Sequence, residues 1–196
     1  MPSCVFLDRD GVLIEDVHLL TDSRQIRLLP GVAQALDRLR RGNYLLVVVT
    51  NQTVVARGLA SLEQVYQINA EIDRRLLAAG AEVDAWYVCP HHPRATLAEH
   101  RIDCECRKPR PGMIRRAAAE HGIDLARSYM VGDRLSDVAA GAAAGCRTIQ
   151  VHSGMHLAAP IETTKPRAEP PRPDHLCAGL LDATPWILTD AARRAA

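Results

Sequence analysis

The sequence predicts an α/β fold built around a mainly parallel β-sheet. Short runs rich in β-branched residues alternate with longer stretches whose apolar residues follow helical spacing, from Cys4 to Val151. The run Tyr44–Val49 is apolar throughout and contains three consecutive valines, which is typical of a strand buried on both faces. Strand, helix and strand in succession form βαβ units with right-handed crossovers, and such units give a parallel sheet.

The first part of the chain supplies two of these strands and the helix between them. Cys4–Leu7 is expected to be a buried first strand, because it leads into the turn-forming sequence Asp-Arg-Asp-Gly. Pro30 and Gly31 open a helical stretch over Val32–Arg41, and the Gly-Asn pair that follows ends it. The next strand, Tyr44–Val49, is followed by Thr-Asn-Gln.

The helix after this strand carries its own start and stop signals. Ser61 and Gln64 have the spacing of a capping box, and the helix is expected to reach Ala79 and to stop at Gly80. The alternation then continues with a strand over Val83–Cys89, a helix from Pro111 to His121, a strand over Tyr129–Val131, a helix over Leu135–Ala144 and a strand over Arg147–Val151.

The composition changes at Pro160–Asp174, where five prolines fall within fifteen residues. We expect this segment to be an extended or mobile loop. After it, residues 175–195 are expected to form a last short strand and a C-terminal helix that folds back onto the domain. A chain of 196 residues then forms one domain, over residues 1–196.

Composition and charge exclude several classes of partner. The net charge is +1, so neither a nucleic acid nor an anionic membrane is expected as a partner. No apolar run approaches the ~20 residues of a membrane span. The N-terminal sequence has no basic region followed by a long apolar stretch, so we expect a cytoplasmic protein. Its six cysteines are then interpreted as thiols or metal ligands.

Polar residues gather where the expected strands end, which is where ligands bind in open α/β sheets. They are Asp8 and Asp10 after the first strand, Thr50 and Asn51 after the second, Lys108 before a helix, and Asp133 after the fourth strand with Asp137 one helical turn later. Converging carboxylates need a cation between them, and their hard oxygen atoms favour Mg²⁺. A lysine and a hydroxyl group suit a phosphate dianion.

Each of these residues has an ordinary structural explanation when it is taken alone. The Asp-Gly sequence suits a turn, Thr50 and Asn51 could cap a helix, Asp133 could be an N-cap, and Lys108 could be a surface charge. Their order along the chain, at successive strand ends, is what favours a catalytic site over these explanations.

The stretches FLDRDGV, VVVTNQ, RKPRPG and MVGDRLSD resemble the four motifs of the haloacid dehalogenase superfamily of phosphatases. The resemblance implies a Rossmann-like three-layer sandwich and a phospho-aspartyl mechanism. Asp8 would be the nucleophile and Asp10 the general acid and base, while Thr50 and Lys108 would bind the phosphoryl oxygens. Mg²⁺ would be held by Asp8, the backbone carbonyl of Asp10 and Asp133, with Asp137 supporting these ligands.

A second group of metal ligands lies in the loop 89–107. Cys89 and His91 form one pair and Cys104 and Cys106 another, and together they make the closed tetrahedral set of a structural zinc site. The alternative is a group of reduced cysteines in a core or on a loop. Spacing alone does not decide between His91 and the adjacent His92. The remaining cysteines lie in apolar strand patterns and are expected to be buried thiols: Cys4, Cys146 and Cys177.

The stretches TNQTVVARG, YVCPHHP and CECRKPRPGM resemble the phosphatases that remove the 7-phosphate of D-glycero-D-manno-heptose 1,7-bisphosphate. This resemblance implies zinc at Cys89, His91, Cys104 and Cys106. It also implies substrate contacts from Asn51, Gln52, Thr53, Arg107, Lys108 and Arg134. Histidinol-phosphate phosphatases share the zinc pairs and are the alternative, as are phosphatases of other small phosphomonoesters. In histidinol-phosphate phosphatases the loop between the zinc pairs is usually shorter than the fourteen residues that separate Cys89 from Cys104, which favours the heptose enzymes.

Chain lengths predict a site without a separate cap domain. Between Asp10 and Thr50 there is room only for a short flap and one helix, and between Thr50 and Lys108 for a helix, a strand and the zinc loop. We therefore expect an open site for a small phosphorylated sugar, with the zinc loop as its wall, and a monomeric enzyme.

Overall fold

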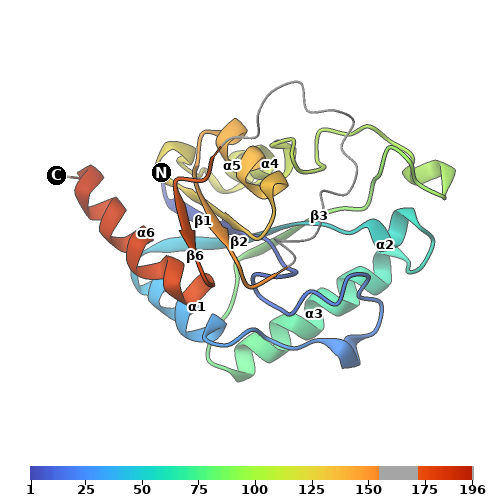
Figure 1. The fold of residues 1–196 in the computed structure, drawn as a ribbon, viewed down its shortest axis with the longest axis horizontal. Coiled ribbons are helices and arrows are strands. Elements are labelled where there is room, and N and C mark those ends of the chain that lie inside the picture. Colours follow the sequence, from blue (N-terminus) through green and yellow to red (C-terminus); the bar gives the residue numbers. More distant parts are fainter. Residues whose placement is uncertain (155–171, 196) are drawn as a thin grey trace.

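The computed structural model describes residues 1–154 and 172–195, and it contains one six-stranded parallel sheet (Figure 1). The strand order is β3-β2-β1-β4-β5-β6, so the first strand lies in the middle. The strands are β1 (Ser3–Leu7), β2 (Tyr44–Asn51), β3 (Ala85–Cys89), β4 (Tyr129–Gly132), β5 (Arg147–Val151) and β6 (His175–Cys177). The expected parallel α/β fold is confirmed.

Helices cover both faces of the sheet and make the three layers of a Rossmann-like sandwich. On one face lie α1 (Val32–Arg41), α3 (Leu62–Ala78) and α6 (Leu180–Ala195), and on the other lie α4 (Gly112–His121) and α5 (Leu135–Ala144) (Figure 1). The short elements are α2 (Thr53–Ala56) and the 3₁₀ turns η1 (Ser23–Gln25), η2 (Ala98–His100) and η3 (Leu125–Arg127).

The central strands are buried on both faces because their apolar residues alternate between two cores. In β1, Val5 and Leu7 belong to the core under α1, α3 and α6, while Cys4 and Phe6 belong to the core under α4 and α5. The valine run of β2 divides in the same way. Full burial of one such side chain contributes roughly 1.5–3 kcal/mol, so these two strands anchor the domain.

The boundaries of the expected strands and helices follow the sequence signals to within two residues. The capping box of Ser61 and Gln64 is present at the start of α3. However, β2 continues to Asn51, α2 was not expected, and β3 begins at Ala85 rather than Val83. Asp84 lies just before β3, where its carboxylate accepts the backbone N–H of Leu46 at 2.7 Å and its own N–H donates to the Leu46 carbonyl at 2.7 Å.

The described residues contain no separate cap domain between β1 and β3. The chain from β1 to β2 forms a flap, η1 and α1, and the chain from β2 to β3 forms α2 and α3. The proline-rich segment predicted at 160–174 falls mostly outside the described residues, and β6 and α6 follow it as expected.

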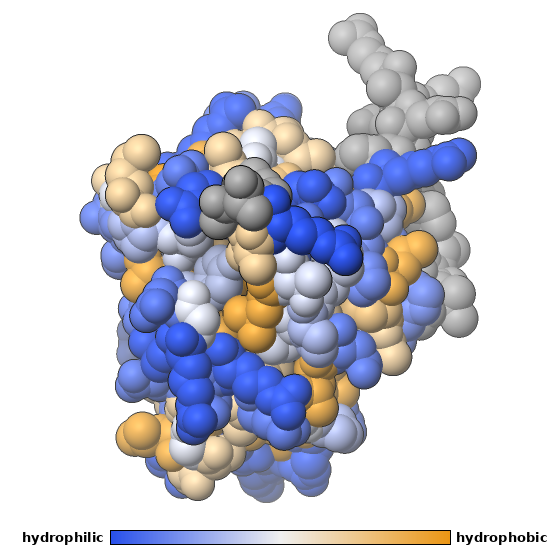
Figure 2. Space-filling model, turned by 90° about the vertical axis from the view of Figure 1, so that its left-hand side faces the viewer, coloured by the Kyte–Doolittle hydropathy of each residue, from blue (hydrophilic) through white to orange (hydrophobic). Residues whose placement is uncertain are grey.

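None of the described helices is both long and apolar enough to cross a bilayer. The face shown in Figure 2 is mostly hydrophilic, with small, separated hydrophobic patches.

Candidate active site

The topology brings the ends of three neighbouring strands together. Because β1 lies between β2 and β4, Asp8 after β1 is flanked by Thr50 at the end of β2 and Asp133 after β4. All three side chains are buried, as are Lys108 and Asp137. So many buried polar groups at one strand edge are unusual unless they bind one another or a ligand.

Lys108 contacts two of the aspartates in this cluster. Its ammonium nitrogen Nζ lies 2.9 Å from Asp8 Oδ1 and 2.7 Å from Asp137 Oδ1, and it donates to the carbonyl of Val49 at 2.8 Å. Burial alone would lower the pKa of Lys108, but the carboxylates of Asp137 and Asp8 outweigh it and raise that pKa. The lysine therefore stays charged.

The carboxyl group of Asp8 is held in a strongly desolvated environment. Burial raises the pKa of Asp8 to about 6, against the opposing attraction of Lys108. The nearby carboxylates of Asp137 and Asp10 raise it further. Any additional positive charge near this carboxyl group would stabilise its ionised form.

Asn51 fixes the backbone that carries the lysine. Its side-chain amide donates to the carbonyl of Lys108 at 3.0 Å, and its oxygen accepts from the Lys108 backbone N–H at 3.1 Å. Both ends of the Asn51 amide thus have protein partners. The predicted contact of Asn51 with substrate stays a prediction.

Gln52 also lies inside the protein, and its side chain is only 3% exposed. Its amide nitrogen donates to Asp10 Oδ2 and to Thr50 Oγ1, each at 2.9 Å, and its oxygen accepts from Arg9 at 2.9 Å. These bonds position the two groups expected to act on the phosphate. The predicted contact of Gln52 with substrate is likewise still a prediction.

The residues present fit a hard divalent cation. Asp8, Asp133 and Asp137 each offer a carboxylate oxygen, and these atoms lie within 4.8 Å of one another. Two glycines make room there, because a Cβ added to Gly11 or Gly154 would come within 2.8 Å or 2.3 Å of Asp133 Oδ2. Three buried carboxylates with one lysine leave an excess of negative charge, which Mg²⁺ would offset.

The predicted ligand from the backbone carbonyl of Asp10 stays a prediction, because this grouping contains side chains only. Asp8 and Asp133 belong to it as expected, and its third side chain is Asp137, which was expected only to support the ligands. The second oxygen of Asp137 accepts the backbone N–H of Arg134 at 3.0 Å. Gly132 permits this position, since a Cβ there would lie 2.1 Å from that of Asp137.

The four predicted zinc ligands converge in the loop 89–107. The sulfur atoms of Cys89, Cys104 and Cys106 lie 3.1–3.6 Å apart, and His91 Nδ1 lies 3.4 Å from Cys106 Sγ. Metal–sulfur bonds of about 2.3 Å in a tetrahedral site place the sulfurs about 3.8 Å apart, so the spacing fits zinc. All six cysteines of the chain are free thiols.

The structure also separates the two adjacent histidines. His91 Nδ1 faces the sulfurs, whereas His92 Nδ1 accepts the backbone N–H of Arg94 at 3.0 Å. Burial, together with the positive charges of Arg107 and Arg94, lowers the pKa of His92. His92 therefore lies outside the cysteine cluster.

The remaining predicted substrate residues follow β2, β3 and β4 in the chain. Thr53 begins α2, and Arg107 donates to the carbonyl of His91 at 3.0 Å. Arg134 forms an ion pair with Asp16 of the flap at 2.9 Å and lies 3.9 Å from Asp133. Asp16 was not among the predicted site residues.

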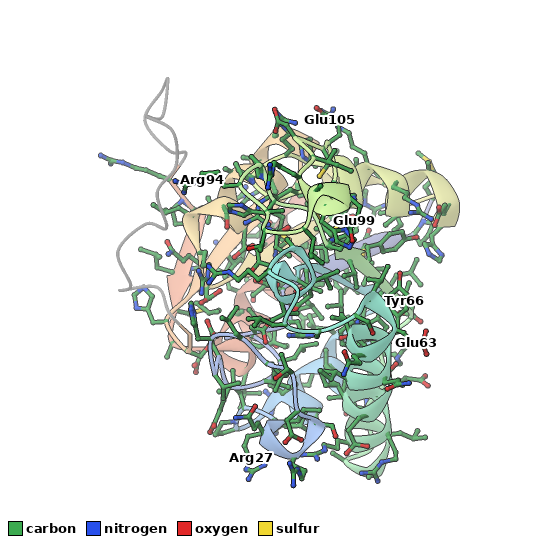
Figure 3. All side chains as sticks on the ribbon, turned by 90° about the vertical axis from the view of Figure 1, so that its right-hand side faces the viewer. Arg27, Glu63, Tyr66, Arg94, Glu99 and Glu105 are labelled. Atoms are coloured by element: carbon green, nitrogen blue, oxygen red, sulfur yellow. The ribbon has the colours of Figure 1, made fainter. Side chains whose placement is uncertain are left out.

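The outer surface of the zinc loop carries both signs of charge. Figure 3 shows Arg94, Glu99 and Glu105 pointing outward from this part of the chain. Glu105 lies 3.4 Å from Arg110, and Asp103 lies 2.8 Å from the same arginine. Such mixed charge differs from the continuous basic surface that nucleic-acid binding requires.

Sequence comparison finds relatives that include heptose bisphosphate phosphatases. The HAD-hydrolase-like family matches residues 105–183. A D-glycero-beta-D-manno-heptose-1,7-bisphosphate 7-phosphatase of Photorhabdus laumondii is 38% identical over 165 residues, which cover 84% of this chain and 86% of the relative. The enzyme of the same name from Vibrio cholerae is 42% identical over 154 residues, which cover 78% of this chain and 83% of the relative.

Solved structures give the same relationship. The D,D-heptose 1,7-bisphosphate phosphatase from B. bronchiseptica, in complex with magnesium and phosphate, superposes with a TM-score of 0.81 and is 33% identical. The alignment covers 96% of this chain and 99% of that one. A putative HAD-like phosphatase from Mesorhizobium loti also gives a TM-score of 0.81, at 28% identity, covering 97% of this chain and 87% of that one.

Proposed function

We propose that this chain, which belongs to the haloacid-dehalogenase-like family of D-glycero-beta-D-manno-heptose-1,7-bisphosphate 7-phosphatases, removes the 7-phosphate of that sugar bisphosphate. The observation that carries the proposal is the buried cluster of Asp8 after β1, Asp133 after β4, Asp137 on α5 and Lys108 before α4. The relative from B. bronchiseptica supports it, since that enzyme was solved with magnesium and phosphate.

The proposed reaction has two steps, each of which uses both aspartates of the first motif. Asp8 attacks phosphorus, the bond from phosphorus to the sugar oxygen breaks, and Asp10 gives its proton to the leaving oxygen. Water then attacks the phospho-aspartate, gives its proton to Asp10, and releases phosphate from Asp8. Bound Mg²⁺ would offset charge between the carboxylate of Asp8 and the phosphoryl oxygens, with Asp8, the carbonyl of Asp10 and Asp133 as its ligands.

Lys108 and Thr50 are proposed to bind the phosphoryl oxygens during both steps. Lys108 is fully charged and has almost no freedom, since Asn51 holds its backbone and Asp8 and Asp137 hold its ammonium group. A preorganised cation of this kind stabilises charge that develops in the transition state. The Thr50 hydroxyl is fixed by Gln52.

The sugar is proposed to lie at the rim formed by α2, the loop 89–107 and the start of α5. Thr53, Arg107 and Arg134 are the proposed contacts in this region, with Asn51 and Gln52 beneath them. Arg107 is held by the carbonyl of His91, so the zinc loop directly determines where its guanidinium points.

We also propose that Cys89, His91, Cys104 and Cys106 bind a structural zinc ion. A closed set of four ligands offers no position for a reacting water. Hydrogen bonding with Cys89, and to a smaller extent with Cys104 and His91, lowers the pKa of Cys106 to about 5 against the effect of burial, which favours the thiolate that zinc requires. Six free thiols suit a reducing compartment, and we propose that the enzyme acts in the cytoplasm.

The test is a phosphate-release assay with Mg²⁺ on both anomers of heptose 1,7-bisphosphate and on histidinol phosphate. We expect the highest kcat/KM on a heptose bisphosphate, with the 1-phosphate retained in the product. A higher kcat/KM on histidinol phosphate would replace the proposed substrate. Full activity after thorough removal of Mg²⁺ would contradict the magnesium site.

A further inference from the structure

A buried arginine lies between the two aspartates of the first motif. Arg9 is 1% exposed and is among the largest fully buried side chains of the described residues. Its Nε donates to Asp10 Oδ2 at 3.1 Å, and its Nη2 donates to Asp10 Oδ1 at 3.0 Å. This two-pronged pairing of a guanidinium with a carboxylate fixes the plane of the carboxylate as well as its position.

The other side of the guanidinium is anchored by two amide oxygens. Arg9 Nη1 donates to Asn69 Oδ1 at 3.2 Å, and Nη2 donates to Gln52 Oε1 at 2.9 Å. Asn69 comes from α3, sixty residues along the chain, and Gln52 from the segment after β2. The arginine is therefore held by elements other than the one that carries it.

Asn69 is an unexpected residue for its position on α3. It lies on the buried face of the helix, beside Val65, Ile68 and Ile72, where an apolar side chain would pack well. Its Nδ2 has no hydrogen-bond partner among the described residues, and a buried unpaired amide is unfavourable. The use of this asparagine thus lies in its oxygen, which binds Arg9.

The carboxylate of Asp10 receives these bonds unevenly. Oδ2 accepts from Arg9 Nε and from Gln52 Nε2, whereas Oδ1 accepts a hydrogen bond from a single donor among the described residues, Arg9 Nη2. One lone-pair direction of Oδ1 is left for another partner. The side chain of Asp10 is 23% exposed, while Arg9, Gln52 and Asn69 are buried, so Asp10 is the member that can reach a ligand.

We propose that Arg9 is the positioning residue for Asp10, and that Asn69 and Gln52 hold Arg9 in place for this purpose. The inference rests on the proposed phosphatase activity. Arg9 exchanges no proton itself. It keeps Oδ1 of Asp10 aimed at the leaving oxygen, to which that atom transfers a proton in the first step and through which it takes a proton from water in the second.

Leaving groups of different acidity separate this role from general support of the fold. An alkoxide leaving from the sugar needs the proton of Asp10, whereas p-nitrophenolate leaves without one. The value of kcat/KM reports the steps up to cleavage of the phosphate ester, and a comparison of two substrates on one enzyme sample cancels the fraction of folded protein. Arg9→Met and Asn69→Leu remove the positioning bonds, and Arg9→Lys and Asn69→Asp retain part of them.

For Arg9→Met we expect kcat/KM on heptose 1,7-bisphosphate to fall by about 100-fold or more, and kcat/KM on p-nitrophenyl phosphate to stay within about threefold of the wild type. Hydrolysis of the phospho-aspartate, the second step, should slow for both substrates. Because p-nitrophenol leaves in the first step, it should appear in a burst of one equivalent per active site. Asn69→Leu should show the same pattern more weakly. Arg9→Lys and Asn69→Asp should recover part of the loss.

The matched control is Arg75→Met. Arg75 lies on α3 and binds the flap through the carbonyls of Ser23 and Ile26, away from Asp10. Its loss should change kcat/KM on both substrates by the same factor. An equal fall on both substrates for Arg9→Met and Asn69→Leu would overturn the positioning role. A faster Arg9→Met enzyme would show that Arg9 restrains Asp10 in an inactive orientation.

The activity of the wild-type enzyme distinguishes a failure of this inference from a failure of the proposed phosphatase function. If the wild type releases no phosphate from either substrate in Mg²⁺, the proposed function fails and the inference fails with it. If the wild type is active and the two kcat/KM values fall together in the variants, only the role of Arg9 is wrong.

Discussion

Replacing Lys108 by methionine should destabilise the fold and abolish turnover for two separable reasons. The ammonium group lies 2.9 Å from Asp8 and 2.7 Å from Asp137, and all three side chains are buried. At an effective dielectric constant of about 20, each contact is worth about 6 kcal/mol before desolvation. Desolvation of the ions removes most of this gain. Breaking a buried pair costs about 3–5 kcal/mol, a large share of the ~5–15 kcal/mol that holds a domain together.

A second substitution separates the two effects. In the Lys108→Met background, Asp137→Asn removes one of the two carboxylates that would face each other, and its side-chain oxygen can still accept the N–H of Arg134. The free energy of unfolding should recover by about 1–2 kcal/mol. Turnover should not recover, because the cation proposed to bind the phosphate is still missing, and kcat should stay at least about 100-fold below the wild type.

The measurement is urea denaturation with zinc present and Mg²⁺ omitted, followed by phosphate release with Mg²⁺ restored. A free energy of unfolding for Lys108→Met within about 1 kcal/mol of the wild-type value would refute the electrostatic reasoning, because an uncompensated buried charge should destabilise the fold by more than that. Recovery of activity in the double variant would refute the proposed contact between Lys108 and the phosphate.

Three further predictions concern the nucleophile, the zinc and a helix cap. Asp8→Asn should abolish phosphate release while the circular dichroism spectrum stays unchanged, and full activity in this variant would exclude Asp8 as the nucleophile. Cys104→Ser should remove bound zinc, measured by atomic emission, and lower Tm by ~2–4 °C for each kcal/mol lost, while Mg²⁺-dependent turnover persists at a reduced level with a higher KM. Unchanged zinc content and Tm would show that the loop is ordered in another way. Ser61→Ala removes the hydrogen bond from the Gln64 backbone N–H to the Ser61 hydroxyl and leaves the reciprocal bond from the residue 61 backbone to the Gln64 side chain. It should cost about 1 kcal/mol in urea denaturation, with kcat unchanged, whereas a loss below about 0.3 kcal/mol would show that the cap is redundant.

The strands, and the convergence of the candidate catalytic side chains, could be predicted because both follow from the pattern and order of the strands. A solid valine run is buried on both faces wherever it lies, and the residues that follow parallel strands meet at one edge of the sheet. Asp8, Thr50 and Asp133 therefore converge as expected. Two close cysteine pairs in a polar loop likewise indicate a metal site at any position in a fold.

The direction in which polar side chains point could not be predicted in this way. The sequence did not reveal that Gln52 makes three hydrogen bonds within the protein, while its predicted substrate contact stays a prediction. Arg9 was passed over, because an arginine beside two aspartates in a turn is usually a solvated charge. One sequence signal was available, since Asn69 is a polar residue on the apolar face of a predicted helix, and such a residue needs a partner.

Two independent sets of contacts fix the position of Lys108. For this reason, loss of zinc is expected to reduce catalysis only in part. On one side, Asn51 binds the backbone of Lys108 through two hydrogen bonds that do not depend on the zinc loop. On the other, the loop ends in a tight turn where Gly112 donates to the carbonyl of Glu105 at 3.0 Å, and a Cβ on this glycine would lie 2.3 Å from that oxygen. Loss of zinc would loosen this turn and the Arg107 that precedes Lys108, yet leave the bonds from Asn51. Binding of the sugar should therefore suffer more than the attack on phosphorus.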